Sequence, residues 1–279
     1  MTKGLAILLM VILHLFCRKG ADVYGTPLLW VNKTTPLIYY LGFFSEICVP
    51  LYSICAGYAQ YLLSERRYIE RRRNLHRMWR LLCNYWIVLI LFCFLGMLLP
   101  SDGSMPGSLI KFLKSIMLIH SYNGAWWFLN TYIILIMIPY RVLFCGVDKI
   151  NSYLGLCFCL ILQIICFFAD KVAIPFGTNM TQPILAFVWK EMVNLIWLLP
   201  YFWAGAFLCK GSIIDKTYLF FEKYIGKYTK LVLCIIFFCL FAGVSAVHKA
   251  ILMPTVAVIM FLLFNCWKKG NTVEKFFCS

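Results

Sequence analysis

Residues 81–99, with the sequence LLCNYWIVLILFCFLGMLL, form an uncharged run long enough to cross a lipid bilayer. Several other runs in the chain approach or exceed the roughly 20 apolar residues that a membrane-spanning helix needs. The 279 residues are 63% hydrophobic and 13% charged, with a mean hydropathy of +0.84, whereas about a quarter of the residues of a soluble protein are charged. The runs lack the alternating pattern of an outer-membrane barrel. We therefore predict an all-α, polytopic integral membrane protein.

Eight apolar segments are expected to cross the bilayer. They comprise residues 4–17, 37–63, 81–99, 124–144, 153–169, 184–208, 229–247 and 250–267. No internal repeat and no long Pro- or Ser-rich linker divides the chain, so residues 1–279 are expected to form a single domain. The 14 cysteines lie mostly within the apolar runs and form no CxxC pair. They are interpreted as small packing residues rather than metal ligands.

Lysine and arginine residues are distributed unevenly over the connections between these segments. With the N-terminus inside, 18 basic residues fall on inner segments and 8 on outer segments. Cytoplasmic loops carry such an excess in membrane proteins, so both termini are predicted to be cytoplasmic. The net charge of +15 is attributed to this bias and to anionic lipid headgroups, and no nucleic-acid partner is expected.

The first apolar segment begins with a basic residue and carries a histidine near its end, in KGLAILLMVILH at residues 3–14. In a helix, Lys3 and His14 lie about 20° from the same face and about 16 Å apart along the axis. A histidine deep in a membrane usually faces other helices or a wet cavity. Glu46 lies inside the second segment, where its carboxylate could orient His14 and stabilise the charged imidazole. The alternative is that Glu46 forms a purely structural ion pair or lies nearer the membrane surface.

The connection between the second and third segments is crowded with arginine and contains no lysine. Its seven arginines are Arg66, Arg67, Arg71, Arg72, Arg73, Arg77 and Arg80. Arg73, Arg77 and Arg80 recur at i, i+4 and i+7 and would line one face of a helix. The planar guanidinium fork suits phosphate better than a lysine ammonium does. This stripe indicates binding either of anionic lipid or of a multiply phosphorylated soluble ligand.

Four stretches of the chain, taken in order, resemble the acyltransferase-3 membrane family. KGLAILLMVILH resembles the family's first helix, in which a basic residue and a histidine flank ten residues, with Lys3 where arginine is more usual. VPLYSICAGY at 49–58 resembles a motif of the second span, with Ala56 in place of the usual serine. RMWR at 77–80 resembles the R-x-x-R signature, and AWWFLNTYI at 125–133 resembles the tryptophan-led start of a middle span.

The resemblance implies a membrane-bound O-acyltransferase of the bacterial cytoplasmic membrane. Such an enzyme would move an acyl group, expected to be acetyl, from cytosolic acyl-CoA to a hydroxyl of a cell-surface glycan or glycolipid. Arg77 and Arg80, helped by Arg73, would bind the phosphates of CoA, and Lys3 would help to place the donor. His14 would act as general base on the acceptor or as a transient acyl carrier. Glu46 is assigned from residue chemistry alone, as the group that orients the histidine; no metal is expected.

Two other interpretations stay open. Family members usually have further C-terminal spans with an S-x-x-x-W/Y-L-x-H-like segment, whereas this chain ends at TVEKFFCS. We therefore expect a C-terminally shortened member of the family. Such a shortened chain could also be an inactive scaffold, which is the first alternative. Alternatively, a transporter or flippase for an anionic glycolipid would use the arginines to bind a lipid diphosphate, and His14 with Glu46 as a proton relay. The absence of an inverted repeat in the sequence counts against a transporter.

Overall fold

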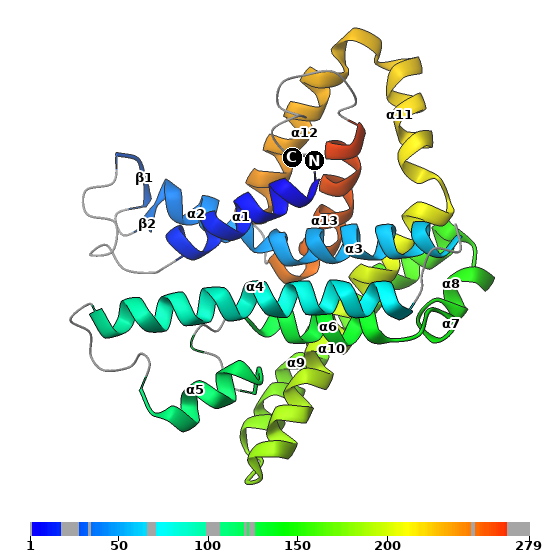
Figure 1. The fold of residues 1–279 in the computed structure, drawn as a ribbon. Helices are drawn as coiled ribbons and strands as arrows, with labels where there is room; N and C mark the ends of the chain where they lie inside the picture. The colour runs from blue at the N-terminus through cyan, green and yellow to red at the C-terminus, as the bar shows by residue number, and fades with distance from the viewer. Residues whose placement is uncertain are drawn as a thin grey trace. The chain divides into compact units, whose positions relative to one another are not determined.

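The computed structural model describes residues 2–17, 28–32, 35–65, 71–98, 107–119, 122, 126–246 and 249–266. Helices make up nearly all of these residues (Figure 1). A short antiparallel pair of strands, β1 (Trp30–Asn32) and β2 (Thr35–Pro36), precedes the second helix. The prediction of an all-α membrane protein is confirmed for the part of the chain described.

The helices follow one another closely along the chain. They are α1 (Thr2–Phe16), α2 (Leu37–Phe44), the 3-10 helix η2 (Ser45–Ile47), α3 (Cys48–Glu65), α4 (Arg71–Leu98), α5 (Leu109–Ile116), α6 (Trp127–Met137), α7 (Tyr140–Leu143), α8 (Cys145–Lys149), α9 (Ser152–Thr178), α10 (Pro183–Lys210), α11 (Ile213–Tyr224), the 3-10 helix η4 (Gly226–Tyr228), α12 (Thr229–Ala246) and α13 (Lys249–Cys266).

Four helical segments among the described residues are long and apolar enough to cross a membrane. They are Leu37–Leu63, Arg72–Leu98, Ser152–Thr178 and Pro183–Lys210. Shorter apolar helices occupy the other four predicted segments, at Thr2–Phe16, Trp127–Met137, Leu231–Gly243 and Leu252–Cys266. The structure thus places a helix in every predicted segment, and the number of eight spans stays a prediction.

The segment predicted over residues 124–144 is not one continuous helix. Its helix α6 ends at Met137, and Ile138 is extended, with ψ of 129°. Proline has no backbone N–H and forces the preceding residue out of the helical region, so Pro139 explains the break. Three α-helices lie outside the predicted segments: α5, in the connection before α6, α8, between α7 and α9, and α11, after α10.

The described chain divides into two compact units. Unit 1 comprises Met1–Leu62, Phe144–Phe168 and Leu198–Ser279, and unit 2 comprises Leu63–Leu143 and Ala169–Trp197. The helices α9 and α10 contribute residues to both units. The single-domain organisation stays a prediction.

Unit 1 is built on unusually close contacts between helix backbones. A methyl group added at Gly57 in α3 would lie 2.7 Å from the carbonyl carbon of Phe202 in α10, and still closer to its oxygen. A methyl group at Gly205 in α10 would lie 2.9 Å from the carbonyl carbon of Ile54 in α3. Only glycine allows this approach, which is a common way for membrane helices to maximise van der Waals contact.

The two ends of the described chain meet in unit 1. The Asn265 amide, near the end of α13, donates to the Thr2 hydroxyl at the start of α1, with an N···O distance of 2.9 Å. Residues 2 and 265 therefore lie at the same end of unit 1, as both must if the two termini share one side of the membrane.

The connection between α7 and α9 is fastened from two sides within unit 1. The Lys210 ammonium, at the end of α10, donates to the carbonyl oxygens of Val147, Asp148 and Ile150 at 2.8–2.9 Å. The Tyr61 hydroxyl in α3 donates to the Asp148 carboxylate at 2.9 Å. A cation at the C-terminal end of α8 satisfies carbonyl groups that have no helical partner there.

In unit 2, the amphipathic helix α5 packs along α4. The Tyr85 hydroxyl donates to the Ser115 carbonyl at 2.7 Å, and the Trp86 indole donates to the Ile116 carbonyl at 3.1 Å. A small core around Tyr85, Leu89 and Cys93 is covered by side chains from α5 and from the start of α6. These contacts fix α4, the helix that carries the arginine stripe, against α5.

Candidate functional site

Lys3 and His14 share one side of α1. The buried residues of this helix are Thr2, Ala6 and Leu9, which fall on one stripe. At 100° per residue, Lys3 and His14 both lie about 100–120° around the helix from Thr2, away from that stripe. Both side chains are exposed. The common face expected from their spacing is therefore present, because α1 is helical without interruption between them.

Glu46 lies beside the C-terminal end of α1. The Cys17 thiol, just after the helix, contacts the Glu46 carboxylate with an Sγ···Oε1 distance of 3.9 Å. One turn before Glu46, a methyl group at Gly42 would lie 2.7 Å from the backbone of Phe16 and Cys17, so the two segments touch there. The structure brings Glu46 to within about one helical turn of His14 along α1, and the role of each stays a prediction.

The arginine stripe occupies the first three turns of α4. This helix runs without a break from Arg71 to Leu98, so the stripe belongs to the same helix as the third apolar segment. Arg73, Arg77 and Arg80 fall within about 60° of one another around the helix. Arg73 and Arg80 are exposed and Arg77 is half-buried. Arg66 and Arg67 lie outside the described residues.

Arg77 is held by α6 in unit 2. Its Nη2 donates to the Tyr132 hydroxyl oxygen at 2.9 Å. One turn earlier on α4, the Asn74 amide donates to the Ile136 carbonyl at 2.9 Å. That carbonyl is in the last turn of α6, where the break at Pro139 leaves it without a helical partner. Asn74 and Tyr132 were not predicted as site residues, because no motif links positions so far apart in sequence.

A buried acid lies on the other side of α6. Glu191, in α10, is 7% exposed, and its Oε2 accepts a hydrogen bond from the Thr131 hydroxyl at 3.3 Å. The Asn130 side chain also hydrogen-bonds Glu191. In the sequence, Glu191 was distinguished only as an acidic residue within a predicted apolar segment. Glu191 belongs to unit 2, as the arginine stripe does.

Comparison with protein families decides the class of this chain. The family model described as an acyltransferase domain matches residues 1–277. The chain belongs to the acyltransferase-3 family. The resemblance drawn from the four sequence stretches is confirmed, and membership together with the apolar helices indicates a multi-pass membrane acyltransferase. No curated protein and no solved structure gives a significant match.

The residues expected to act in this acyltransferase-3 protein are divided between the two units. Lys3, His14 and Glu46 are in unit 1. Arg73, Arg77 and Arg80 are in unit 2. The first set could act on a hydroxyl or an acyl group, and the second set has the chemistry of a phosphate site. No group of three or more His, Cys, Asp or Glu residues that could hold a metal ion occurs among the residues described.

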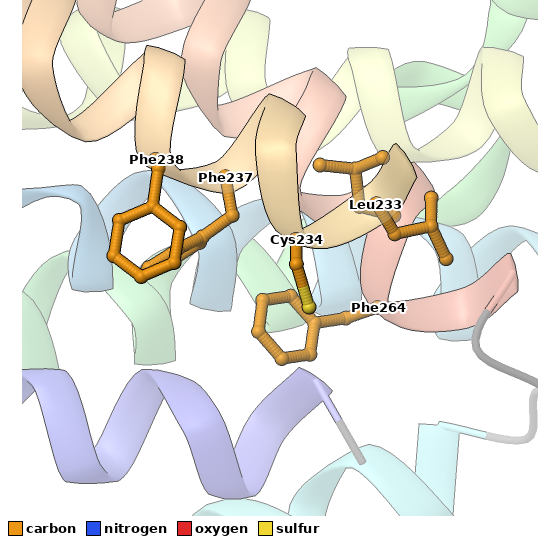
Figure 2. A pocket seen from close by; sticks show the side chains of 6 residues that line it. Leu233, Cys234, Phe237, Phe238 and Phe264 are labelled. Carbon is orange, nitrogen blue, oxygen red and sulfur yellow. The ribbon is translucent and has the colours of Figure 1, made fainter. Parts of the chain in front are cut away.

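A separate apolar pocket lies between α12 and α13 in unit 1 of the acyltransferase-3 chain (Figure 2). It has a volume of about 230 Å³ and is lined by Leu233, Cys234, Phe237, Phe238, Leu263 and Phe264. Side chains of this kind can hold hydrocarbon. They offer no strong donor or acceptor that would orient a hydroxyl or a phosphate, so the candidate reaction groups are the polar residues described above.

Proposed function

We propose that this acyltransferase-3 protein transfers an acetyl group from cytosolic acetyl-CoA to a hydroxyl of a cell-surface glycan or glycolipid. It would do so in the bacterial cytoplasmic membrane, with both termini in the cytoplasm. The observation that carries the proposal is the arginine stripe of α4, in which the Arg77 guanidinium is fixed 2.9 Å from a buried tyrosine. A topology-setting arginine needs no such fixed geometry, whereas a phosphate site gains from it.

The donor end of the reaction is assigned to the arginine stripe. Arg73 and Arg80 present exposed guanidinium groups on the same face as Arg77. Charge-assisted hydrogen bonds from such groups bind the phosphates of CoA, which has three. The inner position of this connection, predicted from the distribution of basic residues, gives the stripe access to cytosolic acetyl-CoA.

The acceptor end is assigned to α1. The neutral His14 imidazole takes the proton of the acceptor hydroxyl as its oxygen attacks the thioester carbonyl carbon. The C–S bond then breaks, the CoA thiolate leaves, and it takes up the proton, so that the products are an ester and CoA. Glu46 orients the imidazole, and Lys3 helps to place the donor near the inner end of the helix. A transient acyl-histidine is the alternative course.

The hydrogen bond between Thr2 and Asn265 supports the assignment of both termini to one side of the membrane. Because basic residues concentrate on that side, the side is assigned to the cytoplasm. Lys3 would then lie near the cytoplasmic surface and His14 about 16 Å further along the helix. This order of residues suits a path that runs from a cytosolic donor toward an acceptor deeper in the membrane or beyond it.

The test is transfer of radiolabel from acetyl-CoA in inverted membrane vesicles, which expose the cytoplasmic face and contain the host's own glycans and lipids. Unaltered protein is compared with His14→Ala and with the double variant Arg77→Ala, Arg80→Ala. Arg72→Ala is the control. Arg72 is an exposed arginine next to Arg73 on α4, but its side chain points away from the face that carries the stripe.

Label fixed into a glycan or lipid fraction by the unaltered protein and by Arg72→Ala, but not by the other two variants, would support the proposal. If all four membranes fix the same background of label at equal expression, this chain does not transfer acetyl groups by itself. The glycolipid transporter and the inactive scaffold would then be the leading interpretations.

A further inference from the structure

Two side chains of α4 reach α6 through hydrogen bonds of different kinds. Asn74 donates to a backbone carbonyl at the end of α6, and Arg77 donates to the Tyr132 side chain. The first bond joins the two helices through backbone geometry. The second bond contributes a side-chain oxygen that sets where one guanidinium group lies. The Asn74 contact can therefore hold the two helices together independently of the Tyr132 contact, which sets the position of Arg77.

The Tyr132 hydroxyl is a fixed acceptor. The residue is 5% exposed, and its ring stacks on Phe128 with centroids 5.8 Å apart and an angle of 25° between the ring planes. Arg77 is half-buried, and its long side chain has many rotamers to lose when it binds a ligand. A rigid hydroxyl that accepts a hydrogen bond from one N–H group of Arg77 reduces that cost.

We propose that Tyr132 is a positioning residue that presents the Arg77 guanidinium to a phosphate of the acyl donor. This inference rests on the proposed function, since it assumes that the stripe binds a CoA thioester. Tyr132 acts through Arg77 and makes no contact of its own with the reacting atoms. Its contribution is to donor binding, before any bond of the thioester changes.

The decisive variant is Tyr132→Phe, which removes the hydroxyl and keeps the stacked ring. We expect the KM for acetyl-CoA to rise about tenfold, as for loss of one hydrogen bond to a charged group, while kcat changes less than about twofold. The asparagine contact between α4 and α6 remains, so the helix pair should stay together. Size-exclusion chromatography in detergent checks that the variant is as monodisperse as the unaltered protein.

Tyr85→Phe is the matched control. Tyr85 lies on α4, is 6% exposed and donates its hydroxyl to the Ser115 carbonyl at 2.7 Å, in the same unit of the protein. This variant also loses a buried phenol hydrogen bond, but one that does not involve an arginine of the stripe. We expect its KM for acetyl-CoA to match that of the unaltered protein.

The combination with Arg77→Ala separates positioning from a structural role. If Tyr132 acts through Arg77, Tyr132→Phe should raise KM no further when Arg77 is already alanine. A positioning role is rejected if the two increases multiply, if Tyr132→Phe leaves KM unchanged, or if Tyr85→Phe raises it equally. Failure of the proposed function has a different signature, because vesicles with unaltered protein would then fix no label at any acetyl-CoA concentration.

Discussion

Replacing Gly57 with alanine is expected to push α3 and α10 apart in unit 1. The added Cβ would meet the Phe202 carbonyl carbon at 2.7 Å and its Cα at 3.0 Å. Ordinary van der Waals contact of a Cβ begins at 3.4 Å. Because all the atoms in the way belong to the backbone of α10, no side chain can rotate aside to relieve the clash.

The size of the effect follows from two opposing contributions. Overpacking of a tight contact costs up to about 3 kcal/mol. Alanine recovers about 1 kcal/mol over glycine in a helix interior. The free energy of unfolding should therefore fall by about 2 kcal/mol, which lowers the midpoint of thermal unfolding by about 4–8 °C for a chain of this size. Gly205→Ala should have a similar effect, because its Cβ meets the Ile54 backbone across the same contact.

Thermal unfolding in detergent, followed by size-exclusion chromatography of heated samples, measures the midpoint. Gly243→Ala in α12 is the control, since a Cβ at Gly243 has nothing within 4 Å among the described residues. This variant should unfold at the same temperature as the unaltered protein or slightly higher. Equal midpoints for the Gly57 and Gly243 variants would refute the close approach of α3 and α10.

Three further substitutions test separate parts of the structure. His14→Ala should abolish acetyl transfer in vesicles without lowering the thermal midpoint, because the side chain is exposed; a lowered midpoint would point to a packing role. Lys210→Met should lower the free energy of unfolding by about 2 kcal/mol, because it removes the cation that three backbone carbonyls share. An unchanged thermal midpoint would contradict that contact. Thr131→Val should lower the free energy of unfolding by about 1–3 kcal/mol, because it removes a hydrogen-bond donor to buried Glu191; thermal unfolding measures the change. In a protein that already carries Glu191→Leu, the same substitution should cause no further loss of stability.

The positions of the apolar helices could be predicted from the sequence because hydrophobic runs are local signals. The second predicted segment, 37–63, coincides with α2 to α3, and the seventh, 229–247, with α12. The helix α5 escaped prediction because its eight residues are too short to resemble a span. A local signal was present, since Ser108 caps the helix by accepting a hydrogen bond from the Lys111 N–H at 3.3 Å. The break at Pro139 was also visible as a proline, but prolines occur in many intact membrane helices.

The candidate site was predictable only as far as helical periodicity reaches. Lys3 and His14 share a side of α1, and the three stripe arginines share a face of α4, as their spacing requires. The partner of Arg77 was not predictable, because Tyr132 is 55 positions away and the pairing depends on how α4 meets α6. Glu46 shows the same limit: its contact with Cys17 depends on the packing of α2 against the end of α1.

The short helix α6 explains why three polar residues stand in a row within an apolar segment. Asn130, Thr131 and Tyr132 point in directions about 100° apart, so no single neighbour can satisfy all three. Asn130 donates to the Leu118 carbonyl at 2.8 Å, Thr131 to Glu191, and Tyr132 accepts from Arg77.

Eleven residues of helix span about 16 Å, half of the hydrocarbon thickness, so α6 depends on its neighbours for its place in the membrane. Hydrogen bonds on several sides provide that placement and offset the cost of burying polar groups in an apolar setting. The same arrangement orients the guanidinium proposed to bind the donor. In unit 2, the residues that fix this half-length helix are therefore also residues that shape the candidate donor site, and an apolar replacement of the Asn-Thr-Tyr triplet would remove both properties together.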